Sequence, residues 1–359
     1  MATTIKLLFL IALHATALNL IVCYAANPLS SKKLLFVFGD SLFDPGNNQY
    51  LNNSMPSASI SWPYGMNMNN KSTGRLSDGL LVPDFVALFA NLPVDPPCMQ
   101  PGADLTSGAN FASAGAGVLG ESNGVMNLNT QLTNFKKVVT LLVQKKGEQE
   151  AKKILMSSVY LFSMGGNDYF RYNLNYRNST KSERVTYMHT VVASLTNGFK
   201  EIYAMGGRKF AIQNVAPLGC LPSTKAMYPE LNGACVKNFL THPKLHNKAL
   251  YNKLNKMAKQ LPGFKHSIMN YYYALGDRIS KSPIYGFKEG KVACCGSELC
   301  NGQNCGVGSY KLCKNPSEYV FFDGGHTTQK TSRQLAELLW SGGPNVTGPY
   351  NVKQLFEFP

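Results

Sequence analysis

The predicted fold rests on the segment LLFVFGDS at residues 34–41 of this 359-residue chain. Five consecutive apolar residues closed by a glycine predict a strand buried on both faces, as in a parallel sheet covered by helices. Ligands of open α/β sheets bind beyond the carboxyl ends of such strands. Ser41 is therefore the first candidate for a functional residue, although a serine after a strand also serves as a helix N-cap or turn residue.

Segments typical of strands alternate with segments of helical periodicity along the rest of the chain. The pattern predicts strands within 108–117, 158–163, 209–215 and 318–322, and helices within 80–90, 132–142, 185–202, 245–261 and 329–340. This alternation predicts a three-layer α/β/α architecture around a mainly parallel sheet. No internal repeat or low-complexity tract interrupts it, so we expect one domain over residues 26–359.

The first 25 residues predict export. Lys6 is their only charge, an apolar stretch follows over residues 7–22, and small residues lie at the end, near Ala25. This layout is typical of a secretory signal peptide at residues 1–25. No later stretch is long and apolar enough to cross a bilayer, so we expect a secreted, extracellular protein without a transmembrane segment.

The cysteines are interpreted in the light of export. One of the nine, Cys23, leaves with the signal peptide, and an even set of eight remains. An oxidising compartment favours disulfides, and the alternative of a zinc site lacks paired C-x-x-C spacing. A single loop separates Cys220 from Cys235, which is the one pairing we predict. The disulfide candidates are Cys98, Cys220, Cys235, Cys294, Cys295, Cys300, Cys305 and Cys313.

The glycosylation sequons and the net charge are also consistent with an exported protein. Asn-x-Ser/Thr sequons predict glycosylation at Asn52, Asn70, Asn178 and Asn345. The formal net charge is +15 at pH 7, but the lysines are dispersed and form no block typical of nucleic-acid binding. A solvated cationic surface is the simplest interpretation. Such a protein would also be drawn toward polyanionic extracellular material.

Four predicted strand ends carry side chains that could work together. They present Ser41, a Gly/Ala turn over 115–117, Asn167 after a glycine pair, and Asp323 with His326 three residues later. A serine hydroxyl is a nucleophile only when a base takes its proton and a third group orients the base. Backbone N–H groups and an amide at the other two strand ends would stabilise an oxyanion. The set predicts acyl transfer.

The motifs around these residues resemble a known family. The blocks GDSL at 39–42, GGND at 165–168 and Asp-x-x-His at 323–326 match, in order, those of the plant GDSL esterase/lipases of the SGNH hydrolase superfamily. Further similar blocks are FDPGNN at 43–48, GRLSDG at 74–79, NFASAG at 110–115, PLGCLP at 217–222 and DRI at 277–279. In this chain Gly325 precedes the histidine and Thr327 follows it, where the family often has a bulkier residue and a proline.

The resemblance implies specific roles. Ser41 would be the nucleophile, His326 the general base and Asp323 its orienting partner, with Ser41, Asn167 and Gly117 or Gly115 forming the oxyanion hole. It also implies no cofactor and a small-molecule, lipid or polysaccharide acyl ester as substrate. Independently of the resemblance, the net positive charge predicts electrostatic association with anionic cell-wall material.

Three alternatives remain open at this stage. A metallophosphoesterase would use Gly-Asp and Gly-Asn motifs, but the chain lacks the histidine and carboxylate ligands that a binuclear site needs. An acyltransferase would use the same acyl-enzyme, and a non-catalytic wall-binding protein would keep only the fold. The long polar stretch 44–79 predicts a functional loop, whose Trp62, Tyr64, Met66 and Met68 could line a substrate mouth.

Overall fold

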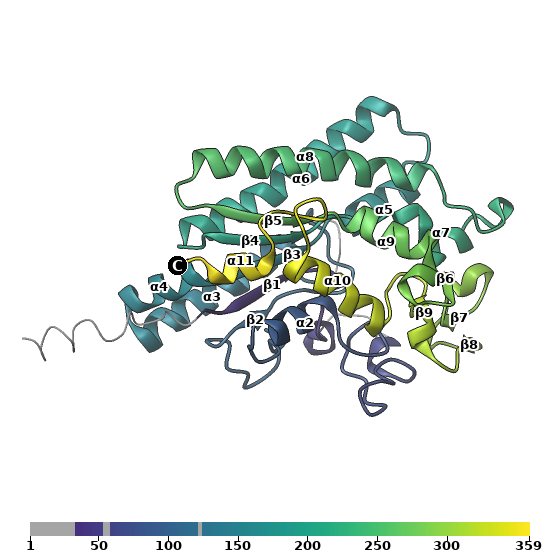
Figure 1. The fold of residues 1–359 in the computed structure, drawn as a ribbon, viewed down its shortest axis with the longest axis horizontal. Helices are drawn as coiled ribbons and strands as arrows, with labels where there is room; N and C mark the ends of the chain where they lie inside the picture. The colour runs from purple at the N-terminus through teal and green to yellow at the C-terminus, as the bar shows by residue number, and fades with distance from the viewer. Residues whose placement is uncertain (1–32, 53–57, 121–123) are drawn as a thin grey trace, which may run out of the picture. The chain divides into compact units, whose positions relative to one another are not determined.

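A six-stranded sheet organises the computed structural model, which describes residues 33–359 except 53–57 and 121–123 (Figure 1). The predicted signal peptide lies outside the described residues, and residues 33–359 form one compact unit. The strand order is β10-β5-β4-β3-β1-β2. Its strands are β1 (Leu35–Gly39), β2 (Ala109–Asn110), β3 (Val159–Ser163), β4 (Lys209–Gln213), β5 (Lys265–Met269) and β10 (Thr347–Pro349).

The pairing confirms the mainly parallel sheet. Strand β1 lies next to the edge strand β2 and pairs in parallel with both β2 and β3, with Gly39 opposite Ser163. Strands β3, β4 and β5 continue in parallel, and only the edge strand β10 is antiparallel. Every residue of β1 is buried, as its unbroken apolar run predicts. Its Phe38 ring stacks between Phe111 and Phe162, at centroid distances of 5.0 and 4.6 Å.

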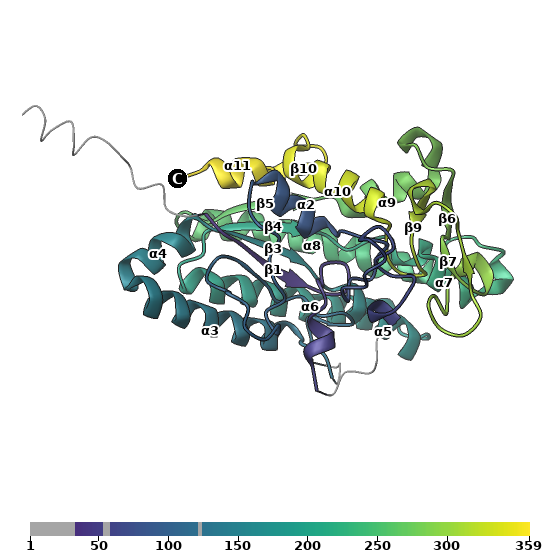
Figure 2. The ribbon, with the colours of Figure 1, turned by 90° about the horizontal axis from the view of Figure 1, so that it is seen from below.

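Helices cover both faces of the sheet, which confirms the three-layer architecture (Figure 2). One face carries α3 (Leu128–Lys146), α6 (Lys181–Ala204) and α8 (Asn238–Gln260), and the other carries α2 (Val82–Phe89), α10 (Gln329–Ser341) and α11 (Val352–Glu357). The remaining helices are α4 (Glu148–Ser157), α5 (Gly166–Asn175), α7 (Pro222–Ala226) and α9 (Tyr271–Ser280). No helix in the described part of the chain is long and apolar enough to span a membrane.

The predicted strand at 318–322 does not belong to the central sheet, which corrects the expectation that all site residues follow strands of one sheet. It forms the short strand β9 (Tyr319–Phe321), which pairs in parallel with β6 (Glu289–Ala293). The chain then turns back at once, because Phe321 also bridges to Thr327. A second small sheet pairs β7 (Cys295–Gly296) with β8 (Lys311–Leu312).

Three disulfides form, and the predicted Cys220–Cys235 pair is among them. The others are Cys294–Cys313 and Cys295–Cys305. The expectation that all eight cysteines pair is wrong for two of them, because Cys98 and Cys300 are free. Cys98 donates its backbone N–H to Asn110 beside β2, whereas Cys300 lies next to Gly233, so these two thiols belong to different parts of the fold.

Candidate active site

Ser41 follows strand β1 at the carboxyl edge of the sheet. The turn between them is held in place by the residues around it. A side chain at Gly39 would place its Cβ 2.6 Å from the Ser163 carbonyl oxygen of β3, so only glycine fits there. The Gln131 side chain binds both the N–H and the C=O of Gly39, at 2.9 and 2.8 Å. Beyond it, Asp40 Oδ1 accepts the N–H of Leu42 at 3.1 Å and holds the turn.

Three of the predicted site residues form a continuous hydrogen-bonded chain. His326 Nε2 lies 2.8 Å from Ser41 Oγ, across 285 positions of sequence. On the other side of the ring, Nδ1 lies 2.7 and 2.9 Å from the two carboxylate oxygens of Asp323. A histidine that donates from Nδ1 presents Nε2 as an acceptor, which is what a base acting on the serine hydroxyl requires.

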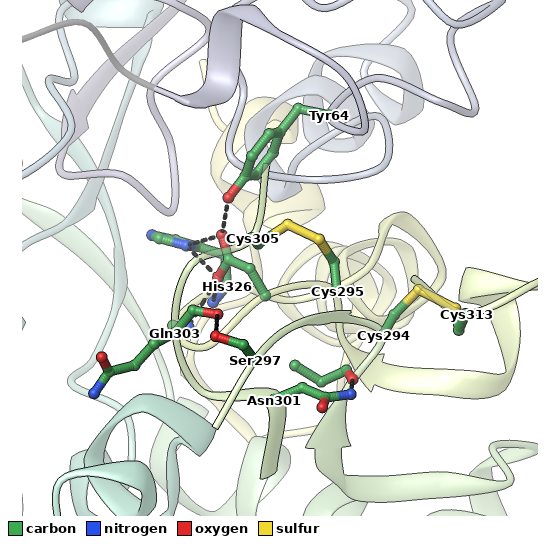
Figure 3. The surroundings of a disulfide bond; sticks show 12 residues. Tyr64, Cys294, Cys295, Ser297, Asn301, Gln303, Cys305, Cys313 and His326 are labelled. Atoms are coloured by element: carbon green, nitrogen blue, oxygen red, sulfur yellow. Dashed lines mark hydrogen bonds and ion pairs between the residues drawn. A yellow bond between two sulfur atoms is a disulfide. The ribbon is translucent and has the colours of Figure 1, made fainter. Parts of the chain in front are cut away.

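The Asp323 carboxylate is itself held by the surrounding chain. Its Oδ1 accepts the backbone N–H groups of Gly325 and His326 at 2.8 and 2.9 Å. Its Oδ2 accepts the hydroxyl of Tyr64 at 2.8 Å (Figure 3). Tyr64 comes from the long polar loop and is buried against Phe322, so its hydroxyl position is fixed by packing. The carboxylate therefore has one orientation toward the imidazole.

The ionised forms of His326 and Asp323 stabilise each other. Burial alone would lower the pKa of His326, but the charge and hydrogen bond of Asp323 outweigh it and raise the pKa above its usual value. Burial likewise favours a neutral Asp323, yet His326 and the hydrogen-bond donors around the carboxylate hold its pKa below the usual range. Burial raises the pKa of the neighbouring Asp40 to about 7. The arrangement stabilises an imidazolium next to a carboxylate.

The loop that carries the histidine is well anchored, although it has Gly325 and Thr327 where the family often has bulkier residues and proline. Its end is tied to the polar loop, because the Ser77 hydroxyl donates to the Thr327 carbonyl at 3.1 Å. Thr327 Oγ1 lies 3.0 Å from the Ser332 hydroxyl of α10. Several hydrogen bonds thus replace the stiffness that a proline would supply.

The predicted oxyanion donors come together around the start of α5. Asn167 is the second residue of that helix, where the positive end of the helix dipole favours a developing negative charge. Its Nδ2 donates to the Ala116 carbonyl at 2.9 Å, which places the amide directly against the 115–117 turn. The amide has a second N–H to offer. Ser41 and Asn167 both line the cavity over the site, and no residue of the 115–117 turn does.

The turn is fixed by an acidic residue that sequence reasoning did not single out. Asp168 accepts the backbone N–H groups of Val118 and Leu119, each at 2.9 Å. A Cβ at Gly117 would lie 2.9 Å from the Asp168 carboxylate and closer still to the Arg171 guanidinium, so a side chain here would displace both groups. The position of Asp168 within the GGND block was the available signal.

A cavity of about 560 Å³ opens over these groups. Its lining includes apolar and polar residues, which we call the apolar wall and the polar wall. Of the four loop residues predicted to line a substrate mouth, only Tyr64 does so, and Trp62, Met66 and Met68 do not. The apolar wall consists of Leu42, Leu76, Phe170, Ala216, Leu218, Leu221, Tyr271 and Val307, and the polar wall of Ser223, Gly302, Gln303 and Asn304.

Disulfides stabilise the polar wall. Gln303 and Asn304 lie in a loop closed by Cys295–Cys305, next to the strand crosslink Cys294–Cys313 (Figure 3). Sequence patterns gave no indication that the cysteine-rich segment borders the serine. Among residues 33–359, as far as they are described, no group of three or more His, Cys, Asp or Glu side chains is arranged to hold a metal ion.

The chain is similar to known proteins over most of its length. Residues 35–339 match the family described as GDSL-like Lipase/Acylhydrolase. The chain is 45% identical over 345 residues to GDSL esterase/lipase 1 of Arabidopsis thaliana, covering 92% of each chain. It is 42% identical to the GDSL lipase of Tanacetum cinerariifolium, covering 90% of this chain and 87% of that one. It is also 37% identical, over 92% of its length and 76% of the other's, to a protein named inactive GDSL esterase/lipase-like protein 25 of Arabidopsis thaliana.

Proposed function

The chain belongs to the GDSL-like lipase/acylhydrolase family and is a hydrolase acting on esters, and we propose that it cleaves acyl esters through Ser41, His326 and Asp323. The observation that carries the proposal is the 2.8 Å contact between His326 Nε2 and Ser41 Oγ, with Asp323 on the other ring nitrogen. This is the arrangement that makes a serine hydroxyl nucleophilic at neutral pH.

The proposed reaction has two stages. Ser41 Oγ attacks the ester carbonyl while His326 takes its proton, and the imidazolium is stabilised by Asp323. The negative charge on the former carbonyl oxygen is met by the backbone N–H of Ser41, the Asn167 amide and an N–H of Gly117 or Gly115. His326 returns the proton to the leaving alcohol, which departs and leaves an acyl-enzyme. Water, activated by the same histidine, then hydrolyses it.

The two walls of the cavity suggest how the ester lies. The apolar wall, with Phe170 and Leu218, suits the acyl chain, because burying apolar surface there is favourable. The polar wall, with Gln303 and Ser223, offers hydrogen bonds to a hydroxylated alcohol moiety. We therefore propose esters of short to medium acyl chains with a polar alcohol. Transfer to an alcohol acceptor instead of water would use the same acyl-enzyme.

The setting of the enzyme is also proposed. We propose a signal peptide at residues 1–25, one domain over residues 26–359, and secretion. The three disulfides are consistent with secretion, because an oxidising compartment favours them. All four predicted glycosylation sites are exposed, as a glycan requires; they are Asn52, Asn70, Asn178 and Asn345.

The test is hydrolysis of nitrophenyl esters of increasing acyl length by the purified protein and by Ser41→Ala and His326→Ala variants. Both variants should lose turnover while keeping their circular dichroism spectrum and melting temperature. Ser280→Ala, an exposed serine on α9, is the matched control and should keep full activity. A fluorophosphonate probe should label the wild type at Ser41. Absence of both turnover and labelling would favour a non-catalytic wall-binding protein, a relevant alternative because one relative is named inactive.

A further inference from the structure

A groove unrelated to the serine runs along helix α8. Two cavities of about 590 and 620 Å³ follow one another between α8 and the β5–β10 edge of the sheet, and Pro349 lines both. Helix α8 and strand β5 lie side by side in both ribbon views (Figures 1 and 2). The first cavity adjoins the carboxyl end of β5, and the second adjoins its start.

One continuous stripe of α8 faces both cavities. The first is lined by Lys244, Lys248 and Tyr251, and the second by Asn255 and Lys259. These positions are spaced by four, three, four and four residues, which places them on one helix face. From the first lysine to the last, the helical rise gives a groove about 22 Å long.

The groove is cationic throughout. Helix α8 contains five lysines, all exposed, and no aspartate or glutamate; they are Lys244, Lys248, Lys253, Lys256 and Lys259. Among the described residues that line the two cavities there is likewise no acidic side chain, while Lys265 adds a further positive charge. An acid-free concave surface concentrates its field and favours an extended polyanion.

Exposed aromatic rings accompany the lysines. Tyr251 and Tyr273 line the first cavity and are 50% and 63% exposed, although tyrosines normally bury most of their ring. Lys244 lies over the ring of Tyr272 at 5.8 Å from its centroid. Rings that are open to solvent beside cations offer stacking surfaces to a ligand with flat apolar faces and negative charges.

We propose that this groove binds an anionic polysaccharide, a chain of sugar rings bearing carboxylates. Lysine ammonium groups are point charges that suit dispersed carboxylates, and no arginine, the residue best matched to phosphates, lines either cavity in the described part of the chain. The concave form of the site suits a single extended chain better than a flat membrane surface. Tyr271 lines the cavity over Ser41, whereas its neighbour Tyr272 lines the groove, and the groove shares no lining residue with that cavity.

The test measures binding to immobilised polygalacturonate at low and physiological salt. Lys244→Gln/Lys248→Gln/Lys259→Gln should weaken binding about tenfold, the expected loss of three weak ion pairs, equivalent to about 1.4 kcal/mol. Lys137→Gln/Lys146→Gln/Lys152→Gln, which removes three exposed charges from α3 and α4, is the matched control and should bind as wild type does. Because Asn345 lies at the groove and is a predicted sequon, every variant is made in an Asn345→Gln background.

Two further measurements make the result decisive. Tyr273→Ala should weaken binding without changing net charge, and hydrolysis of a small nitrophenyl ester should be unchanged in all groove variants. Equal weakening by both lysine triples would mean that net charge alone acts and would overturn the proposal. So would an absence of binding, or tighter binding to a single-stranded oligonucleotide or to anionic lipid vesicles.

Discussion

Replacing Tyr64 with phenylalanine isolates one hydrogen bond of the catalytic chain. The change removes the hydroxyl that donates to Asp323 Oδ2 at 2.8 Å and keeps the ring that packs against Phe322. A hydrogen bond to a charged group contributes about 1.5–3 kcal/mol. The lower end applies, because two backbone N–H groups still hold the other carboxylate oxygen. A loss of about 1.4 kcal/mol corresponds to a roughly tenfold fall in kcat/KM.

The same variant should also move the pH profile. The Tyr64 hydroxyl helps hold the pKa of Asp323 low by stabilising the carboxylate charge. Without the Tyr64 hydroxyl, the Asp323 carboxylate is stabilised more by protonated His326. The pKa of His326 therefore rises further. Since only the neutral imidazole acts as base, the pH of half-maximal rate should shift upward. A purely structural tyrosine would leave that pH unchanged.

The assay is nitrophenyl ester hydrolysis from pH 5 to 9, with Tyr203→Phe as control. Tyr203 also donates its hydroxyl to a protein acceptor, the Pro262 carbonyl at 2.8 Å, but far along the chain from any site residue. The control should match wild type in rate and profile. If Tyr64→Phe retains kcat/KM within twofold and its profile does not move, the assigned positioning role is wrong.

Three further outcomes are expected. Asn167→Ala should lower kcat by about 10² to 10³, the usual effect of losing one oxyanion donor, and an effect confined to KM would contradict that role. Wild-type hydrolysis should rise with pH and reach half its maximum above pH 6.5, because the pKa of His326 is raised, and a flat profile measured over pH 5–9 would count against histidine as base. Cys295→Ser/Cys305→Ser opens a disulfide that links residues 10 apart, so urea denaturation should show a loss of about 3 kcal/mol, and KM should rise because the wall containing Gln303 loosens.

The sequence carried much of the fold because two inner strands, β1 and β3, are almost entirely apolar. Burial on both faces of a parallel sheet favours such runs, so these strands were recognisable without tertiary information, and the shorter apolar run at 210–212 marked β4. The strand β9 was recognised as a strand but assigned to the wrong sheet. Periodicity reports which residues are buried and says nothing about the partner strand, and β9 pairs with β6 outside the central sheet.

The sequence by itself also predicted the candidate reacting groups, since Ser41, Asn167, Asp323 and His326 lie in blocks whose order and spacing are specific. Only the tertiary structure decided what surrounds them. It brought Tyr64 to the Asp323 carboxylate, Asp168 to the turn before α3, and a disulfide-closed loop to the cavity wall. These contacts join segments that are tens to hundreds of residues apart. Local sequence cannot encode them, because they depend on how the packed layers bring distant loops to one edge of the sheet.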